Sequence, residues 1–370
     1  MTRFYFDYAA KGSGDKLGGE TTEEAMMAVQ ENIQELEETA RALVAQGKGI
    51  LAADESEGTI TKRFEQVGVE STEENRRAYR EMLFTTPGAE EFISGVILFD
   101  ETIRQSAADG TPFPRLLSER GIIPGIKVDK GAKDLASAPG EKITEGLDGL
   151  RERLAEYRGL GARFTKWRAV ITIDDDIPSP YCIWTNAHAL ARFAGLSQEA
   201  GLVPIVEPEV LMDGDHTIER SFEVTSRTLH AVFTELRDQR IQPEGMLLKP
   251  NMILSGYDAA EQADHEEVAE LTVKCLRRHV PTAVPGIVFL SGGQTDEDAT
   301  ANLNAMNAVG PHPWQLSFSY GRALQQAALK AWAADPANVE EAQKAFHRRA
   351  KFNGAARTGS YAPKMEEVAA

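Results

Sequence analysis

The sequence predicts a single α/β domain folded as a (β/α)8 (TIM) barrel, with an N-terminal helical extension and a C-terminal tail. Short β-prone runs alternate with longer amphipathic helical stretches, eight such runs occur, and no low-complexity linker or change of composition divides the chain. Eight parallel strands, each followed by a helix, make this barrel, and single barrels commonly reach the length of this 370-residue chain. The predicted boundaries are an arm at 1–21, the barrel domain with its leading helix at 22–353, and a tail at 354–370.

The first segment is aromatic up to Tyr8 and then rich in glycine up to Gly19. Termini are usually loose unless they are tied down, so we expect a flexible arm; docking of the arm on another subunit is the alternative. From Thr22 onward the apolar residues recur at helical spacing, which predicts a helix that leads into the barrel. These apolar residues are Met26, Val29, Ile33, Leu36, Ala40, Leu43 and Val44.

The eight β-prone runs are mostly continuous apolar stretches, as expected for parallel strands that are covered on both faces. They occupy 49–54, 95–99, 125–129, 164–171, 203–210, 245–252, 286–293 and 314–321. The helical stretches between them have capping residues and periodic apolar positions. They include 73–83, 147–160, 186–200, 218–239, 265–278, 297–307 and 323–333. The last segment, from Gly354, is small and polar, so it is expected to lie outside the barrel.

The composition is that of a soluble globular protein with a strong acidic excess. There are 57 acidic residues against 40 basic ones, and the formal net charge is −17. Such a field repels phosphate backbones, which argues against nucleic acid as a partner. An acidic protein that binds a phosphorylated metabolite must gather its basic groups locally, so lysines and arginines within motifs carry the most information.

Other features of the sequence favour a cytoplasmic protein without a cofactor. Nothing approaches the ~20 apolar residues of a membrane span, and the first residues lack the apolar core of a signal peptide. The two cysteines, Cys182 and Cys275, are best explained as apolar fillers in a reducing compartment, with a disulfide as the alternative. Neither the cysteines nor the seven histidines have zinc-binding spacing, so no metal or other cofactor is predicted.

Polar residues gather where the predicted strands end, and barrel enzymes place their active sites at that end. In chain order these residues are Asp54, Lys127, Asp129, Lys166, Arg168, Glu207, Glu209, Lys249, Asn251, Ser291, Gly292, Gly293, Ser319, Gly321 and Arg322. A lysine within a strand is costly to bury, and three occur here. Each could be half of an interior ion pair, but three of them at barrel strand ends favour a function.

The last two predicted strands end in motifs that suit a phosphate group. In LSGGQ, Ser291 supplies a hydroxyl, while Gly292 and Gly293 let the backbone approach an anion closely. In SYGRA, Gly321 has the same property, and the planar guanidinium of Arg322 matches phosphate oxygens. Barrels frequently bind phosphate at strands seven and eight, so a phosphate site is predicted here.

The lysines and acids together predict imine chemistry. A lysine with a lowered pKa attacks a ketone, and the resulting protonated imine is an electron sink. A neighbouring cation lowers that pKa because it disfavours a second positive charge. Loss of water from the carbinolamine needs an acid, and breaking the bond beside a hydroxyl needs a base. Lys249, Lys166, Glu207 and Asp54 could fill these roles.

These residues lie in motifs that resemble class I fructose-bisphosphate aldolase. The motifs are LAADES, GIKVDKG, KWR, VEPE, LLKPNM, FLSGGQ and FSYGRAL, with the flanking stretches TEENRR, GVILF, GLDGL and DGDH. They occur in order from about Gly47 to Trp332, which makes the resemblance very specific. It implies a metal-independent lyase that cleaves fructose 1,6-bisphosphate to dihydroxyacetone phosphate and glyceraldehyde 3-phosphate in glycolysis or gluconeogenesis. The resemblance also allows a role in the Calvin cycle, and a homotetramer is typical of the family.

The resemblance also implies a role for each motif residue. Lys249 would form the imine, and Glu207 would be the acid and base for carbinolamine dehydration, with Glu209 shaping its hydrogen bonds. Asp54 would take the proton from the C4 hydroxyl, with Lys166 stabilising charge. The C1 phosphate would be bound by Ser291, Gly292, Gly321 and Arg322, with Gly293 in the same motif, and the C6 phosphate by Ser56, Thr59 and Lys127, with Lys62, Arg63 and Arg168 as supporting cations.

The sequence departs from the family pattern in three places. Thr59 stands where the family usually has serine, and the hydroxyl is kept. Animal members end in a tyrosine used in proton exchange, whereas this chain ends in Ala370, and Tyr361 matches a different family tyrosine, so that role is not transferred. The arm before Thr22 lies outside the motifs that carry the resemblance.

Two other interpretations remain open at this stage. One is another imine-forming barrel, such as a transaldolase or a deoxyribose-phosphate aldolase, although two predicted phosphate sites disfavour substrates with one phosphate. The other is a binding or scaffold protein, although a scaffold has no use for lysines buried at strand ends. Among aldolase substrates, the sequence leaves open fructose 1,6-bisphosphate, fructose 1-phosphate and sedoheptulose 1,7-bisphosphate.

Overall fold

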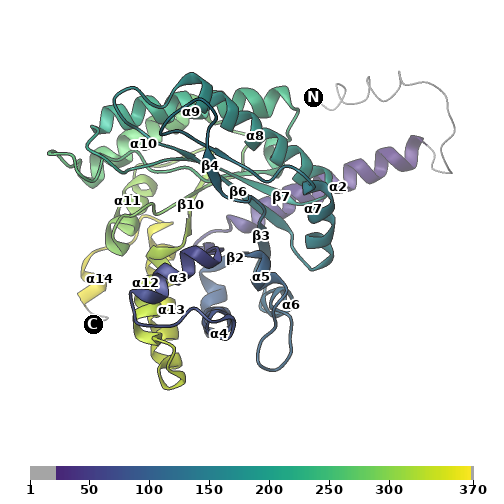
Figure 1. Cartoon of the computed structure of the whole chain (residues 1–370), viewed down its shortest axis with the longest axis vertical. Coiled ribbons are helices and arrows are strands. Elements are labelled where there is room, and N and C mark those ends of the chain that lie inside the picture. The colour runs from purple at the N-terminus through teal and green to yellow at the C-terminus, as the bar shows by residue number, and fades with distance from the viewer. Residues whose placement is uncertain (1–21, 368–370) are drawn as a thin grey trace.

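Eight parallel strands form a closed barrel in the computed structural model, which describes residues 22–367 (Figure 1). Around the barrel the strands follow the order β1-β10-β9-β8-β7-β6-β3-β2. Because helices return the chain along the outside between successive strands, all eight carboxyl ends lie at one end of the barrel. The predicted fold class is confirmed. The predicted arm at 1–21 and the last three residues of the predicted tail lie outside the described range.

Each barrel strand coincides with one of the eight predicted runs. The strands are β1 (Gly49–Ala53), β2 (Ile93–Leu98), β3 (Ile123–Lys127), β6 (Phe164–Ile171), β7 (Val203–Val210), β8 (Leu247–Leu248), β9 (Gly286–Phe289) and β10 (Gln315–Tyr320). In the pairing of neighbouring strands, Lys127 lies opposite Lys166 and Arg168 lies opposite Glu207. The register therefore places Lys127 and Lys166 at one level of the barrel, and Arg168 and Glu207 two residues further along.

Helices surround the barrel and include all seven predicted helical stretches. They are α2 (Thr22–Leu43), α3 (Glu57–Glu65), α4 (Glu73–Phe84), α5 (Asp100–Ile103), α6 (Phe113–Glu119), α7 (Leu150–Gly159), α8 (Pro180–Glu199), α9 (Ile218–Asp238), α10 (His265–His279), α11 (Asp296–Ala308), α12 (Arg322–Trp332), α13 (Val339–Ala356) and α14 (Lys364–Glu367). Helix α8 begins at Pro180 rather than at residue 186, because Ser179 caps it and accepts a hydrogen bond from the backbone N–H of Cys182.

The second half of α2 closes the barrel at the end opposite the carboxyl ends of the strands. Leu36, Leu43 and Val44 pack in one buried cluster with interior strand residues such as Phe164. A glycine near the start of β2 makes room for this helix, since a Cβ on Gly95 would lie 2.6 Å from Cδ2 of Leu43. The helix predicted to lead into the barrel therefore fills its bottom.

Two parts of the chain differ from the sequence-based expectation. A two-stranded antiparallel sheet of β4 (Ala132–Asp134) and β5 (Lys142–Thr144) follows β3 and was not predicted. Helix α13 runs through the predicted boundary at residue 354, and a Cβ on Gly354 would lie 2.8 Å from the carbonyl oxygen of Gly47. The small residues that suggested a loose tail are therefore small because the helix packs closely there.

The chain stays packed beyond α13 as far as Tyr361. The Tyr361 side chain is only 7% exposed, its ring packs near Phe352, and its backbone N–H donates to Oδ1 of Asn304 at 2.9 Å. Its hydroxyl donates to Oε1 of Glu366 at 3.0 Å. The start of the predicted tail is thus part of the outer helical layer.

Within residues 22–367, no helix is both long enough and apolar enough to cross a membrane. Cys182 and Cys275 are both buried and unpaired. Burial raises the pKa of each thiol to about 11, so both stay protonated at neutral pH. The alternative of a disulfide between them is therefore wrong.

Candidate active site

Four charged side chains predicted to be catalytic meet at the carboxyl end of the barrel. Nζ of Lys166, from β6, lies 2.7 Å from Oδ2 of Asp54 and 3.0 Å from Oε2 of Glu207. Nζ of Lys249, directly after β8, lies 3.2 Å from Oε1 of Glu207. All four side chains are buried, and each has an oppositely ionisable partner within 3.2 Å, which makes their burial tolerable.

The two lysines of this cluster differ in the direction of their pKa shifts. Burial lowers the pKa of Lys249, and the positive charge of Lys166 lowers it further, against the opposing effect of Glu207. Burial also acts to lower the pKa of Lys166, but Asp54 and Glu207 outweigh it and raise that pKa above its ordinary value. Lys249 is therefore the amine that loses its proton more readily, while Lys166 stays a cation.

The two carboxyl groups of the cluster stay ionised. Burial acts to raise the pKa of Asp54 and of Glu207, but the coulombic attraction of Lys166 and Lys249 outweighs it in both cases. Their pKa values consequently fall below the ordinary range. Two ionised carboxylates beside the same pair of lysines provide two separate proton acceptors within one site.

A second group of predicted residues lies on the neighbouring ends of β3, β6 and β7. Nζ of Lys127 lies 2.9 Å from Oδ1 of Asp129, and Oδ2 of Asp129 accepts a hydrogen bond from the backbone N–H of Arg168 at 3.2 Å. The Arg168 guanidinium in turn pairs with the buried carboxylate of Glu209. These contacts hold Lys127 and Arg168 beside the cluster of Asp54, Lys166, Glu207 and Lys249.

The predicted hydroxyls for a phosphate group lie at the start of α3. Oγ of Ser56 and Oγ1 of Thr59 are 3.1 Å apart. Ser56 is the N-cap residue, yet its side chain makes no capping bond, so its hydroxyl is directed to Thr59. Lys62 is exposed on the same helix, and Arg63 is half-buried. The first turn of a helix favours an anion because its backbone N–H groups point toward it.

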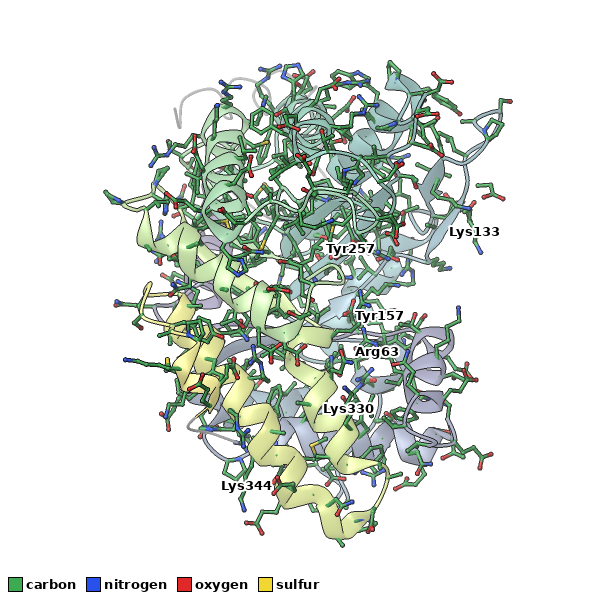
Figure 2. All side chains as sticks on the ribbon, turned by 90° about the vertical axis from the view of Figure 1, so that its left-hand side faces the viewer. Arg63, Lys133, Tyr157, Tyr257, Lys330 and Lys344 are labelled. Carbon is green, nitrogen blue, oxygen red and sulfur yellow. The ribbon has the colours of Figure 1, made fainter. Side chains whose placement is uncertain are left out.

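The glycine motifs after β9 and β10 meet as the sequence predicts. Nη2 of Arg322 donates to the carbonyl oxygen of Gly292 at 2.7 Å, and Gly292 has a φ of +65°, which favours glycine. A Cβ on Gly293 would lie 2.9 Å from the hydroxyl oxygen of Tyr257, so any larger residue at position 293 would crowd Tyr257. Ser291 is buried directly before the two glycines, and Gly321 directly precedes Arg322. Figure 2 shows Tyr257 and Arg63 in the central part of the molecule.

Sequence reasoning missed a buried polar network next to Asp54. The Glu55 carboxylate is bound by Arg63, by Nη2 of Arg80 at 2.6 Å and by Nε2 of Gln325 at 2.9 Å. Glu55 could have been noticed because it follows Asp54 in the LAADES motif. Arg80 and Gln325 look like ordinary surface residues of charged or polar helices, so the sequence offers no signal for them.

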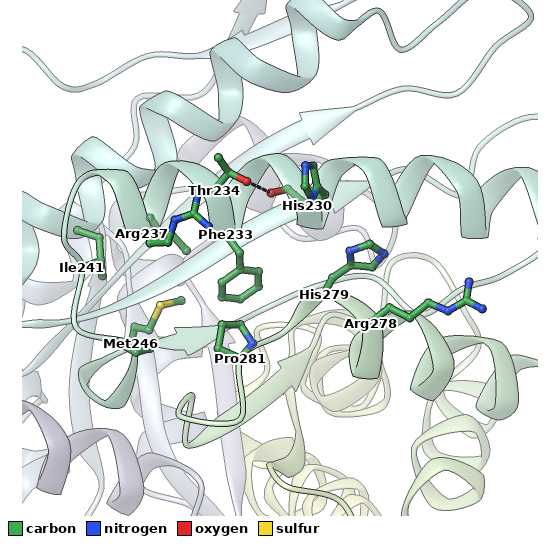
Figure 3. A pocket seen from close by; sticks show the side chains of 11 residues that line it. His230, Phe233, Thr234, Arg237, Ile241, Met246, Arg278, His279 and Pro281 are labelled. Carbon is green, nitrogen blue, oxygen red and sulfur yellow. Dashed lines mark hydrogen bonds between the residues drawn. The ribbon is translucent and has the colours of Figure 1, made fainter. Parts of the chain in front are cut away.

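A pocket of about 410 Å³ lies elsewhere on the molecule, at the C-terminal ends of α9 and α10 (Figure 3). It is lined by His230, Phe233, Thr234, Leu236, Arg237, Ile241, Pro243, Met246, Arg278, His279 and Pro281. Helices return the chain in a barrel, so their C-terminal ends lie near the beginnings of the strands. This pocket is therefore at the opposite end of the barrel from Lys249 and is not part of the candidate site.

Comparison with known proteins points to one family. Residues 35–370 match the family model described as fructose-bisphosphate aldolase class-I. A Xylella fastidiosa protein named "Probable fructose-bisphosphate aldolase class 1" is 62% identical over 331 residues, which cover 89% of this chain and 99% of that protein. The protein named "Fructose-bisphosphate aldolase 1" from Toxoplasma gondii is 55% identical over 334 residues, covering 90% of this chain and 92% of that protein.

The fold agrees with a solved structure of the same family. Fructose-bisphosphate aldolase from Plasmodium falciparum, crystallised in a ternary complex with TRAP and a small-molecule inhibitor, superposes with a TM-score of 0.89. The two chains share 50% sequence identity, and the match covers 90% of this chain and 96% of the other. With the family model and the close relatives, this match shows that the chain belongs to the class I fructose-bisphosphate aldolase family.

Proposed function

We propose that this chain reversibly cleaves fructose 1,6-bisphosphate to dihydroxyacetone phosphate and glyceraldehyde 3-phosphate through an imine on Lys249. The observation that carries this proposal is the buried cluster of two lysines and two carboxylates, in which one lysine has a lowered pKa and the other a raised one. A nucleophilic amine beside a fixed cation is what imine chemistry requires.

The first half of the reaction forms the imine. The neutral amine of Lys249 attacks the C2 carbonyl carbon of the open-chain sugar, and the carbonyl oxygen takes up a proton from solvent to give a carbinolamine. Glu207, whose Oε1 lies 3.2 Å from Nζ of Lys249, takes a proton from the attacking nitrogen and returns it to the departing hydroxyl, which leaves as water. The product is a protonated imine that withdraws electrons from C3.

The second half breaks the bond between C3 and C4. Asp54 accepts the proton of the C4 hydroxyl, the C4 carbonyl forms, and the electron pair of the C3–C4 bond moves into the imine to give an enamine. Lys166, at 2.7 Å from Asp54, keeps that carboxylate ionised and oriented. Glyceraldehyde 3-phosphate leaves, C3 of the enamine is protonated, and hydrolysis of the imine releases dihydroxyacetone phosphate.

Two separate groups of polar residues support a substrate with two phosphates. The Ser291, Gly292, Gly293, Gly321 and Arg322 group would bind the C1 phosphate. The C6 phosphate would be bound by Ser56, Thr59 and Lys127, with Lys62, Arg63 and Arg168 nearby. Transaldolase and deoxyribose-phosphate aldolase substrates have one phosphate, so they would leave one of these groups unused.

Borohydride trapping in the presence of dihydroxyacetone phosphate tests the reaction directly. We expect a reduced, stable adduct on the wild-type protein and cleavage of fructose 1,6-bisphosphate that survives dialysis against EDTA, since the imine already supplies the electron sink. Cleavage without any trapped adduct, or a loss of rate on dialysis that zinc restores, would refute the proposed mechanism. If neither cleavage nor an adduct is observed, the proposed enzyme activity is wrong and the chain is a binding protein instead.

Arg322 is expected to bind phosphate rather than to move protons. Arg322→Ala should raise KM for fructose 1,6-bisphosphate and the inhibition constant of a phosphate inhibitor together by roughly ten- to a hundredfold, because a charge-assisted contact contributes about 1.5–3 kcal/mol. Lys330→Ala is the matched control, because Lys330 is an exposed cation in the last turn of the same helix. Steady-state kinetics with both ligands measures the effect, and unchanged affinity for both would remove Arg322 from the site.

We further propose a cytoplasmic homo-oligomer, a tetramer by family resemblance, that binds neither nucleic acid nor membranes. The Arabidopsis thaliana protein named "Fructose-bisphosphate aldolase 4, cytosolic" is 56% identical over 316 residues, which cover 85% of this chain and 80% of that protein. The net charge of −17 supports the absence of nucleic acid binding. Size-exclusion chromatography with light scattering would measure the number of subunits.

A further inference from the structure

Glu55 lies where α3 and α12 meet, and these helices carry residues of the two proposed phosphate-binding groups. It directly follows Asp54 at the end of β1 and directly precedes Ser56, the N-cap residue of α3. Its side chain is buried, and both of its oxygens are bonded. Oε1 is bound by Arg63 of α3 and by Nε2 of Gln325, and Oε2 is bound by Nη2 of Arg80 at 2.6 Å.

Gln325 ties helix α12 to this carboxylate and to β1. It lies one helical turn after Arg322, and its Nε2 donates both to Oε1 of Glu55 at 2.9 Å and to the carbonyl oxygen of Ala52 at 2.7 Å. Its own Oε1 accepts a hydrogen bond from the hydroxyl of Tyr79, on α4, at 3.1 Å. Gln325 therefore fixes the helix that carries Arg322 relative to β1, which Asp54 directly follows.

Arg63 extends from α3 toward the same carboxylate of Glu55. Its Nη2 lies 3.6 Å from the position that a Cβ on Gly321 would occupy, so the α3 cation touches the beginning of α12. Figure 2 shows Arg63 between the purple helices and the yellow-green helix α12. Glu55, Arg63, Arg80 and Gln325, which we name the Glu55 junction, thus join α3, α4 and α12 at one carboxylate.

Stability alone gives little reason for such a junction. Replacing a buried ion pair with apolar side chains of similar size is often neutral or stabilising, because the charges lose their hydration on burial. The Arg80 side chain is only 3% exposed, and its Nη1 has no hydrogen-bond partner among the described residues. Burial of these charged groups costs desolvation free energy. In return, the junction holds α3, α4 and α12 in a fixed arrangement.

We propose that Arg80 and Gln325 are positioning residues. Through Glu55 they set the distance between the two groups of phosphate-binding residues, on α3 and at the start of α12, and so favour sugar bisphosphates over monophosphates. A substrate with two phosphates must satisfy α3 and α12 at the same time, whereas a monophosphate needs only one of them. This inference rests on the proposed cleavage of fructose 1,6-bisphosphate, and it adds specificity residues that do not touch the substrate.

The test compares kcat and KM for fructose 1,6-bisphosphate and fructose 1-phosphate. In Arg80→Met and Gln325→Leu, KM for the bisphosphate should rise about tenfold, the smaller cost of losing one charge-assisted contact, while both constants for the monophosphate stay within about twofold. Arg80→Lys keeps a cation for Oε2 of Glu55 and should recover most of the bisphosphate affinity. Arg77→Met is the matched control on α4, because Arg77 pairs with Glu74 and Glu81 instead.

The outcomes separate this inference from the proposed function. An equal loss for both substrates, or no loss for either, would show that the junction only supports the fold and would overturn the inference. Failure of the wild-type protein to cleave either substrate would overturn the proposed function instead. If Arg80→Met does not fold, Gln325→Leu gives the same test, because it leaves both ion pairs of Glu55 in place.

Discussion

Lys249→Met should abolish the adduct that borohydride traps with dihydroxyacetone phosphate. Methionine keeps the unbranched apolar chain but has no nucleophilic nitrogen, so the imine cannot form. Cleavage of fructose 1,6-bisphosphate should fall by roughly 10⁵-fold or more, as the loss of a nucleophile does in other enzymes. Intact-mass measurement after reduction reports the adduct, and a coupled assay reports the rate.

The fold should tolerate this substitution. Glu207 keeps Lys166 as a partner at 3.0 Å, and the removed amine is one whose positive charge the buried site already disfavours. The melting temperature should therefore change little. Lys344→Met is the control, because Lys344 is an exposed residue of α13 paired with Glu340, and it should trap as much adduct as the wild type. An adduct that persists in Lys249→Met and maps to Lys166 would contradict the assignment.

Asp54→Asn should separate cleavage from imine formation. Asparagine has nearly the same shape as aspartate but cannot accept the proton of the C4 hydroxyl. The rate of cleavage should fall by about 10²–10⁴-fold, the range for removal of a general base. Lys249 and Glu207 remain in contact, so dihydroxyacetone phosphate should still be trapped by borohydride.

The same two assays check this prediction, with Asp134→Asn as the control. Asp134 is an exposed carboxylate of β4 that pairs only with Lys142 among the described residues, so its replacement should alter neither assay. Loss of trapping together with cleavage in Asp54→Asn would mean that Asp54 is needed to form the imine, and the division of roles between Asp54 and Glu207 would be wrong. An unchanged rate of cleavage would remove Asp54 from the reaction.

The barrel and the residue types at the carboxyl ends of its strands could be predicted from the sequence alone. Parallel strands covered on both faces must be apolar throughout, so the eight runs stand out locally, and all eight are strands in the structure. A polar residue at the carboxyl end of such a run lies at the end of the barrel where active sites are formed. This is why Asp54, Lys166, Glu207 and Lys249 could be named together before their distances were known.

Contacts between distant parts of the chain could not be predicted and are seen only in the folded protein. Gln325 and Glu55 are separated by 270 positions, and nothing near either residue in the sequence indicates the other. The same holds for Leu43, which fills the space that Gly95 leaves at the bottom of the barrel, and for Gly354, which packs against Gly47. Local periodicity reports which face of an element is apolar, but it does not report which partner covers that face.

The direction of the lysine pKa shifts is a further property that the sequence could not supply. Both Lys166 and Lys249 are buried lysines in or next to strands, and burial alone would lower the pKa of both. The pKa of Lys166 is raised because two carboxylates contact this lysine, whereas Lys249 contacts one carboxylate and lies near the cation Lys166. Which amine loses its proton more readily therefore depends on distances of a few ångströms among side chains from four strands, and only the closed barrel sets those distances.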